Sequence, residues 1–297
     1  MASIYTHKDA NIRKTWLLML GFLIVVILIG WGFSWYMGDA VVLYVAVALA
    51  LGMNVSAYWW SDKLVIKMTG AHPITRDSHR ELWNVVENLS ITAGLPMPKV
   101  YVVDDPAPNA FATGRNPKHA VVAATTGLLQ ILNKTELEGV IAHELSHIGN
   151  RDMFVSTVAV VLVGFIAILA DIFLRMMYFG GGHDRDSRAG VAFLLLGLVA
   201  AILAPIAAQL IHLAISRKRE FLADASGALL TRYPEGLATA LEKIAVHGME
   251  MRKTSHATAH LFIANPFGSN GRGMHWVNKL FSSHPDPKER VRILRGL

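Results

Sequence analysis

Four long runs of apolar residues constrain the fold of this chain more than any other feature of its sequence. They cover residues 15–37, 40–60, 153–174 and 190–215. Since a helix rises about 1.5 Å per residue, each run can cross the roughly 30 Å hydrocarbon layer of a bilayer. The sequence therefore predicts an integral membrane protein with four transmembrane helices.

The residues that flank these runs predict their orientation. Tryptophans lie near the ends of the first two runs, where indole rings favour the headgroup region: Trp16, Trp31, Trp35, Trp59 and Trp60. Basic residues precede the first run and follow the second, but none lies in the turn between them: Lys8, Arg13, Lys14, Lys63 and Lys67. The positive-inside rule then places both ends of this hairpin in the cytoplasm.

The charge and the absence of cysteine exclude several classes of site. The net charge is +6, but the basic residues flank the spans instead of forming one basic and aromatic surface. This distribution predicts contact with an anionic lipid bilayer and no nucleic-acid partner. Without cysteine there is no disulfide and no thiolate metal site, so any metal must bind to histidine and carboxylate. The sequence predicts no particular oligomeric state.

Two polar segments remain outside the apolar runs, residues 61–152 and 216–297. In the first, a capping box at 78–81 predicts a helix, and β-branched runs at 99–104 and 119–124 predict two strands joined by a loop-rich connection. A second capping box, at 135–138, predicts a helix that runs to Gly149. We expect one α+β domain with a small sheet, interrupted by the second pair of spans.

The helix predicted to end at Gly149 carries the motif His143-Glu144-Leu145-Ser146-His147. Histidines four residues apart project from one helix face about 6 Å apart, so both imidazoles can reach one metal ion. Glu144 then borders the open position of that metal and can take a proton from water. The motif predicts a catalytic zinc site. The alternative is a solvated helix face that happens to carry this histidine pair.

A catalytic zinc commonly takes three protein ligands, so the motif requires a third. We predict Glu220, on a helix that follows the fourth apolar run, with Asp224 on the same face to accept the second ring N–H of a liganding histidine. His212 is a competing candidate, but eight residues separate it from Glu220. Since that is about 12 Å along a helix, the two cannot bind one ion.

These residues resemble the HtpX-type membrane metalloproteases, which are related to the CAAX prenyl endoproteases and the mitochondrial Oma-type proteases. The resemblance covers nearly the whole chain. A membrane hairpin follows the motif that ends at His147, Glu220-x-x-x-Asp224 follows that hairpin, and His284-Pro285-x-x-x-x-Arg290 lies near the C-terminus. Four spans rather than seven favour the HtpX type over the prenyl endoproteases.

The resemblance implies one Zn²⁺ per chain, held by His143, His147 and Glu220, with Glu144 as general base and general acid. It implies that Asp224 supports a ligand, that His284 donates a hydrogen bond to the developing oxyanion, and that Arg290 pairs with a carboxylate near the site. Asn109, Ala110 and Phe111 resemble the edge strand with which related zinc proteases bind an extended peptide. A turn between two strands is the alternative for these three residues.

The expected fold is that of a mainly α integral membrane protein with a cytoplasmic α+β catalytic domain of the zincin-like, gluzincin type. Residues 1–60 form the N-terminal transmembrane hairpin and 61–152 the first catalytic segment, with the motif helix. Residues 153–215 form the second transmembrane hairpin, and 216–297 the second catalytic segment, with the third ligand. The resemblance implies a bacterial cytoplasmic (inner) membrane, with both termini in the cytoplasm.

The predicted function is that of a zinc metalloendopeptidase. Its substrates would be misfolded or damaged membrane proteins or other unfolded polypeptides, cut on the cytoplasmic side in quality control and the stress response. A non-catalytic membrane scaffold with structural zinc is disfavoured, because it has no need of Glu144 or of an open metal position. A transporter is also disfavoured, because its ligands would lie inside the spans.

Overall fold

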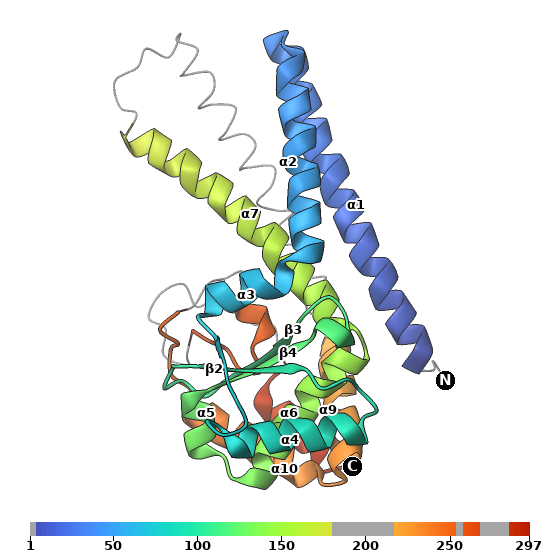
Figure 1. The fold of residues 1–297 in the computed structure, drawn as a ribbon, viewed down its shortest axis with the longest axis vertical. Coiled ribbons are helices and arrows are strands. Elements are labelled where there is room, and N and C mark those ends of the chain that lie inside the picture. Colours follow the sequence, from blue (N-terminus) through green and yellow to red (C-terminus); the bar gives the residue numbers. More distant parts are fainter. Residues whose placement is uncertain (1–3, 180–216, 254–257, 268–284) are drawn as a thin grey trace.

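The computed structural model of the chain describes residues 4–179, 217–253, 258–267 and 285–297. Helices α1 (Ile4–Met37) and α2 (Ala40–Trp59) form a hairpin that extends from a compact polar domain, and α7 (Asp152–Phe179) diverges from it (Figure 1). In α1 and α2 the stretches Asp9–Trp35 and Ala40–Trp59 are long and apolar enough to cross a membrane, with mean hydropathies of 2.5 and 2.1. The protein is therefore mainly helical, with at least two candidate spans.

The third predicted span is supported only in part, and the structure does not describe the fourth. Helices α6 (Lys134–Gly149) and α7 form a third candidate span only if they are counted together across their bend of 82°. The fourth predicted span, residues 190–215, lies outside the described residues. The structure thus bears out a helical membrane protein with two or three candidate spans.

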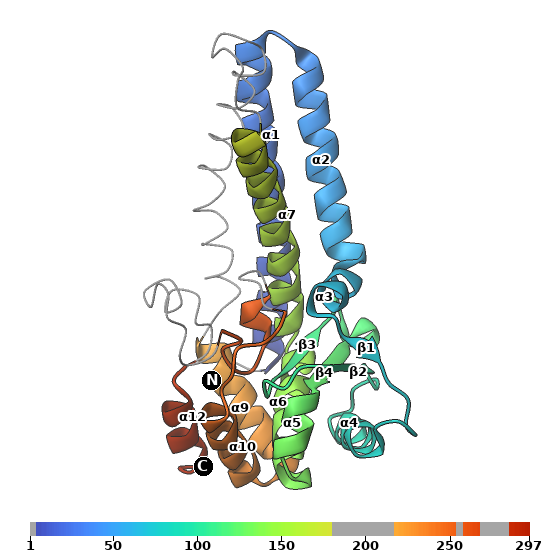
Figure 2. The ribbon, with the colours of Figure 1, turned by 90° about the vertical axis from the view of Figure 1, so that its left-hand side faces the viewer.

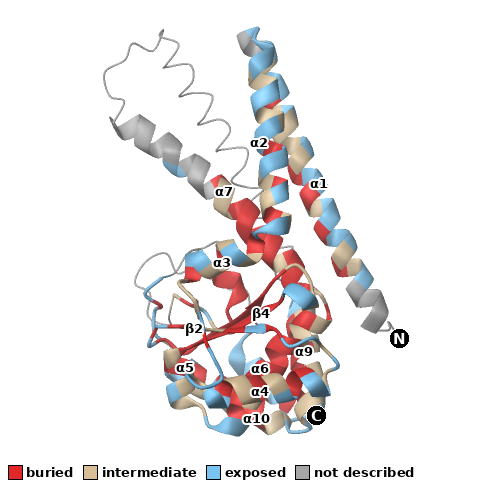
Figure 3. Ribbon diagram, viewed as in Figure 1, coloured by how far each residue is buried: buried red, intermediate tan, exposed pale blue. Residues whose placement is uncertain are grey.

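The surface of the hairpin suits a lipid environment. All five tryptophans predicted for the membrane interface are exposed, with Trp35 at 80%. Figure 3 shows mainly exposed and half-buried residues along α1 and α2, whereas the sheet strands in the interior of the polar domain are mainly buried. The hairpin turns at Gly38, whose φ of 67° favours glycine, and Asp39 accepts a hydrogen bond from the Val41 N–H to cap α2.

A mixed four-stranded sheet lies next to the end of the hairpin. Its strands are β1 (His72–Pro73), β2 (Lys99–Val103), β3 (Ala110–Thr113) and β4 (Val121–Thr125), in the order β1-β2-β4-β3. Strands β2 and β4 are parallel, and the two outer pairs are antiparallel. The expected strands at 99–104 and 119–124 correspond to β2 and β4. The connection between them, read as loop-rich, contains the additional strand β3.

The two faces of the sheet pack against different parts of the chain. Since side chains alternate along a strand, Val100 and Val102 of β2 face a core with α4 (Arg80–Thr92), α6 and α10 (Pro234–Val246). On the opposite face, Val103 and Phe111 belong to a second core with residues of α1, α2, α3 (Ser61–Thr69) and α7. The sheet therefore joins the membrane-proximal helices to the rest of the polar domain.

The residues that the sequence predicted for two capping boxes do not form them in the structure. Ser78 does not cap α4: its hydroxyl bonds with Thr75, and the helix begins at Arg80 after an uncapped His79. The box at the start of α6 is formed two residues earlier than predicted, between Asn133 and Glu136. The sequence contains both patterns, and the backbone places Asn133 rather than Thr135 at the extended position before the first turn.

The remaining described helices also belong to the polar domain. They are α5 (Thr126–Ile131), α9 (Arg217–Thr231) and α12 (Pro287–Leu294), with short 3₁₀ turns at Pro117–His119 and Ala259–Leu261. Figure 2 shows α9, α10 and α12 on one side of α6, and the sheet and α4 on the other. Helix α6 is thus the central helix of the polar domain.

Candidate active site

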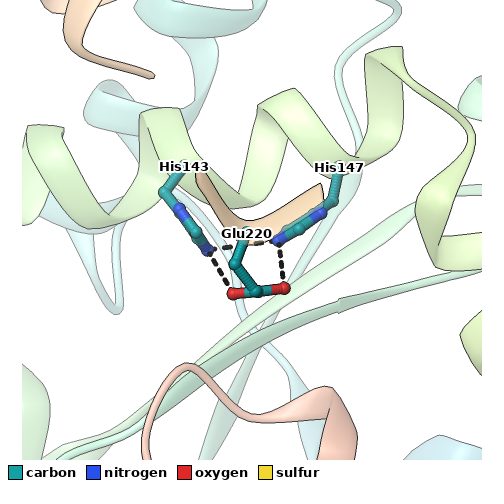
Figure 4. A group of neighbouring side chains, drawn as sticks. All are labelled: His143, His147 and Glu220. Carbon is teal, nitrogen blue, oxygen red and sulfur yellow. Dashed lines mark hydrogen bonds and ion pairs between the residues drawn. The ribbon is translucent and has the colours of Figure 1, made fainter. Parts of the chain in front are cut away.

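The motif histidines and Glu220 converge on one point. The Nε2 atoms of His143 and His147 lie 3.1 Å apart, and they lie 3.7 and 3.6 Å from the two carboxylate oxygens of Glu220. Figure 4 shows both rings, which project from α6, directed at this carboxylate, which comes from α9. One atom from each residue lies within 4.8 Å of the others, so the group could hold a metal ion. Two imidazoles and one carboxylate form a donor set that zinc favours.

Glycine allows α9 to approach α6 closely enough for this convergence. A Cβ atom at Gly227 would lie only 3.0 Å from the His143 backbone nitrogen and 3.3 Å from its Cα. One turn earlier on α6, a Cβ at Gly139 would lie 2.6 Å from the backbone nitrogen of Leu237 in α10. Because side chains at these two glycines would separate the helices, the spacing of the metal-binding group depends on them.

His143 is held by an ion pair inside the polar domain. Its Nδ1 lies 2.9 Å from Asp224, and Arg290 donates two hydrogen bonds, of 2.7 and 2.8 Å, to the same carboxylate. All three residues are at most 1% exposed. Burial would by itself raise the pKa of Asp224, but the charge and hydrogen bonds of Arg290 lower it to about 2. Asp224 therefore stays ionised and accepts the His143 ring N–H.

His147 faces a carboxylate that the sequence did not single out. Its Nδ1 lies 3.3 Å from Oδ2 of Asp152, the first residue of α7. The chain reaches Asp152 through Arg151, whose φ of 62° turns the backbone sharply between α6 and α7. The other oxygen of Asp152 accepts a hydrogen bond of 2.6 Å from the side-chain amide of Asn11 in α1. Each histidine thus has a carboxylate on its second ring nitrogen.

The pKa values of the two histidines move in opposite directions. Burial lowers the pKa of His143 from 6.5 to about 4, against the hydrogen bond with Asp224. Burial also acts to lower the pKa of His147, but the negative charges of Glu220 and Asp152 outweigh it and raise the value to about 9. His147 is therefore the histidine that must lose a proton before a metal binds near neutral pH.

Glu144 lies beside the metal-binding group and is 2% exposed. Burial is the largest cause that raises its pKa, from 4.5 to about 7, with a further contribution from the charge of Glu220. Its carboxylate accepts a hydrogen bond from the backbone N–H of Ala112 in β3. A carboxylate with a pKa near 7 can both accept and donate a proton at neutral pH.

A small cavity lies between these groups. Its volume is about 30 Å³, room for one or two water molecules. Beside the motif residues, its walls come from β3, from the first turns of α7 and from the 3₁₀ turn at 259–261, through Ala112, Met153, Ser156, His260 and Leu261. The metal-binding group and the Glu144 carboxylate therefore border one cavity that is large enough to admit water.

The predicted substrate-binding residues lie at the edge of the sheet beside this cavity. Ala110 and Phe111 belong to β3, the last strand in the sheet order, and Asn109 directly precedes it, so the segment is an edge strand and not a turn. Asn109 forms side-chain hydrogen bonds with the backbone of Ala264, and the carbonyl of Ala110 accepts one from Ile263. Phe111 points away from the cavity and stacks edge-on against Phe262. It is Ala112 whose backbone faces the site.

The structure thus brings six of the predicted residues together: His143, Glu144, His147, Glu220, Asp224 and Arg290. His284 and the competing ligand His212 lie outside the described residues. Sequence reasoning missed Asp152, Asn11 and Ala112. Asp152 carried no local signal, because it approaches His147 only through the turn at Arg151 after α6 has ended. Asn11 lies in the basic segment before the first apolar run and carried none.

Known proteins resemble this chain over most of its length. The profile of peptidase family M48 matches residues 76–297. A protease HtpX homolog from Caldanaerobacter subterraneus subsp. tengcongensis is 45% identical over 301 residues, which cover 99% of this chain and 98% of that protein. Protease HtpX homologs from Tropheryma whipplei (strain Twist) and Streptococcus gordonii are 46% and 43% identical, each over 99% of this chain and over 98% and 100% of their own lengths.

A solved structure resembles the fold as well. The crystal structure of S. mikatae Ste24p matches with a TM-score of 0.50 and 17% sequence identity. The match covers 98% of this chain but 66% of that one. At this identity the likeness concerns the fold alone.

Proposed function

Because the chain belongs to peptidase family M48, and within it to the HtpX-type proteases, it is a membrane-bound zinc metalloprotease, and we propose that His143, His147 and Glu220 hold its zinc ion. The observation that carries this assignment is the convergence of two imidazoles and one carboxylate from helices far apart in the sequence. Three protein ligands leave one position for water or substrate, which a catalytic zinc requires. Membership of a peptidase family leaves no support for the scaffold and transporter alternatives.

Glu144 is the proton carrier of the proposed reaction. When bound, zinc supplies a Lewis acid that polarises the scissile carbonyl and lowers the pKa of the attacking water. Glu144 takes a proton from that water and later gives it to the leaving amine. Its pKa of about 7 suits both steps, because the carboxylate exchanges a proton readily at neutral pH. The hydrogen bond from Ala112 fixes the carboxylate beside the cavity.

Two further residues have supporting roles in the proposal. Arg290 acts through Asp224: it keeps this carboxylate ionised, and Asp224 in turn orients His143. His284, by the family resemblance, donates a hydrogen bond to the oxyanion that develops on the scissile carbonyl. Preorganised donors of this kind typically contribute about 10²–10³-fold to the rate.

We propose that the substrate aligns along β3 as an extended peptide. A strand at the edge of a sheet binds a peptide through its backbone, which gives affinity with little sequence selectivity. The pairing of Asn109 and Ala110 with 263–264 assigns them the role of anchoring one end of this edge. Ala112, the residue of this edge strand that lines the cavity together with Glu144, is then the position where substrate backbone meets the catalytic centre.

The proposed topology has four spans and a cytoplasmic catalytic domain. Residues 61–152 and 216–297 contribute to one domain, because ligands from α6 and α9 meet in one site. The apolar run at 190–215, which precedes α9, supports a fourth span that returns the chain to the side on which α7 begins. Lys8, Arg13 and Lys63 flank the first hairpin on the side of the domain, which supports the cytoplasmic face of a bacterial inner membrane.

We propose that the substrates are misfolded membrane proteins, cut in cytoplasmic loops or tails as part of quality control. Two features support this class. The walls of the cavity include the first turns of α7, so the site lies next to the membrane-proximal helices. Recognition of backbone along an edge strand selects unfolded chain rather than a particular sequence.

The test is digestion of a denatured membrane protein by the purified full-length chain in detergent. Addition of zinc to the metal-free protein should start cleavage, and Glu144→Gln should keep its zinc but lose cleavage by at least about 10²-fold, the lower end of general base effects. Glu220→Ala should lower the zinc content. Normal cleavage by Glu144→Gln would reject its role, and unchanged zinc stoichiometry in Glu220→Ala would reject this residue as a ligand.

A further inference from the structure

A buried amide from the first membrane helix lies behind the metal-binding group. Asn11 of α1 is 5% exposed, and its Nδ2 donates to Oδ1 of Asp152 at 2.6 Å and to the carbonyl of Asn150 at 3.0 Å. These partners are about 140 residues away in the sequence and lie at the break between α6 and α7. Asn11 therefore connects the N-terminal hairpin to the helix break next to His147.

The contact matters because the two carboxylate oxygens of Asp152 have different partners. Oδ2 faces Nδ1 of His147 at 3.3 Å, and Oδ1 is held by Asn11. Among the described residues, Arg219 also approaches Oδ1, but its Nη1 lies farther away, at 3.8 Å. The shortest hydrogen bond to this carboxylate is thus the one that α1 supplies. A carboxylate fixed at one oxygen presents the other in a constant direction.

We propose that Asn11 is a positioning residue for the zinc site: it fixes Asp152, Asp152 orients the imidazole of His147, and the N-terminal membrane hairpin thereby contributes to zinc affinity. This inference rests on the proposed ligand role of His147. The chain of contacts is short, since it has one hydrogen bond at each step. Partners that orient a liganding histidine typically contribute about 10–100-fold to metal affinity.

A purely structural role is the alternative for Asn11. Its second bond, to the Asn150 carbonyl, could simply stabilise the corner between α6 and α7. The two roles differ in how the effect of Asn11 depends on Asp152. If Asn11 acts through Asp152, its removal has no further effect on zinc affinity once Asp152 is gone. If it only stabilises the corner, the two substitutions have independent effects.

The experiment is a double-mutant cycle on the full-length protein in detergent, with zinc affinity measured by competition with a chelator. The variants are Asn11→Ala, Asp152→Ala and the double variant, with Asn11→Leu as a second substitution that keeps the branched shape of the side chain. Asn54→Ala is the matched control: Asn54 is a buried asparagine of α2 in the same hairpin, and its recorded hydrogen bond goes to Ala50 of its own helix. Thermal unfolding of each zinc-free variant reports stability separately.

The expected result is a loss of zinc affinity of about tenfold in Asn11→Ala and Asn11→Leu, no change in Asn54→Ala, and a double variant no weaker than Asp152→Ala. The inference is overturned if both Asn11 variants bind zinc as tightly as the unsubstituted protein, or if their effect adds fully to that of Asp152→Ala. Failure of the unsubstituted protein to bind zinc would instead overturn the proposed function, and this inference with it.

Discussion

His143 and His147 lie one turn apart on the same helix, but the carboxylates behind them are anchored in different parts of the molecule. We call His143–Asp224–Arg290 the inner arm and His147–Asp152–Asn11 the membrane arm. The inner arm is fixed by a buried, doubly hydrogen-bonded ion pair within the polar domain. The membrane arm is fixed by a neutral amide from the transmembrane hairpin.

The difference separates two contributions to one site. The inner arm contains a charge pair whose desolvation is compensated only while both partners are present, so it couples the metal site to the stability of the fold. In the membrane arm the closest partner of Asp152 is the neutral amide of Asn11, and the Arg219 guanidinium lies farther away, at 3.8 Å, so this arm couples the site mainly to the position of α1. Substitutions in the two arms should therefore differ in whether stability or zinc affinity changes more.

Breaking the inner arm should have the largest effect on stability. Arg290→Met leaves the Asp224 carboxylate buried without its cation, and removal of one partner of a buried pair typically lowers the free energy of unfolding by about 3–5 kcal/mol. Thermal or denaturant unfolding of the zinc-free protein in detergent measures the loss. A loss below about 1 kcal/mol would contradict the role assigned to this pair, because that is the range of exposed pairs.

The pH dependence of the zinc-free protein should reveal the membrane arm. The pKa of His147 is raised from 6.5 to about 9 in the folded state, so its protonation stabilises the fold fully below pH 6.5, and this contribution is lost as the pH rises through about 9. Its upper limit is about 3 kcal/mol, because a tenfold change in proton affinity corresponds to about 1.4 kcal/mol. Unfolding measured between pH 6.5 and 9.5 checks this.

His143 and Glu144 do not cancel the loss of stability that deprotonation of His147 causes at alkaline pH. The lowered pKa of His143 removes stability only as the pH falls from 6.5 towards 4, and the raised pKa of Glu144 removes it as the pH rises from 4.5 through about 7. In Asp152→Ala, the loss assigned to His147 should be smaller and should be complete at a lower pH, since one of the charges that raise its pKa is gone. An unchanged profile in this variant would contradict the contact.

Removal of the carboxylate in the membrane arm should act mainly on zinc. Asp152→Ala should lower zinc affinity by about 10–100-fold, equivalent to about 1.4–2.7 kcal/mol, because His147 loses the partner of its second nitrogen. The zinc-free variant should lose less stability than Arg290→Met. Chelator competition and unfolding on the same preparations give both values. The reverse pattern, with intact affinity and a large loss of stability, would remove the distinction between the arms.

The smallest effect is expected at Arg295, a matched arginine directly after the helix that carries Arg290. Arg295 follows α12 and donates hydrogen bonds to both oxygens of Glu235 and of Glu242, but these side chains are 39–46% exposed. Arg295→Met should leave stability and zinc affinity unchanged, because solvent screens exposed pairs. If it destabilised the protein as much as Arg290→Met, burial would not be the cause of the inner-arm effect.

The sequence predicted the parts of the site that depend on local spacing. The i,i+4 histidines and Glu144 follow from helix geometry, and Glu220 and Asp224 follow from the same rule once a third ligand is required. The cap of α6 lies two residues earlier than predicted because Asn133 and Thr135 both satisfy the local pattern. The family resemblance suggested an edge strand at 109–111, but whether β3 lies at the edge depends on the order of strand pairing in the whole sheet.

The membrane arm could not be predicted because it depends on two tertiary facts. Arg151 adopts a left-handed backbone conformation, which no local pattern around Asn150 required, and this turn brings Asp152 back towards His147. Asn11 reaches Asp152 only because α1 packs against the start of α7. The sequence-based prediction included no residue at the break between α6 and α7, whereas Asp152 lies there and contacts His147.

The central claim is that two imidazoles of α6 and the Glu220 carboxylate hold the zinc ion. X-ray absorption at the zinc edge of the zinc-loaded protein tests it most directly, since it counts the imidazole ligands and measures their distances. We predict two imidazoles at about 2.0–2.1 Å with oxygen ligands in the unsubstituted protein, and one imidazole in His147→Ala loaded at the same stoichiometry. Two imidazoles in the His147→Ala spectrum would contradict the claim.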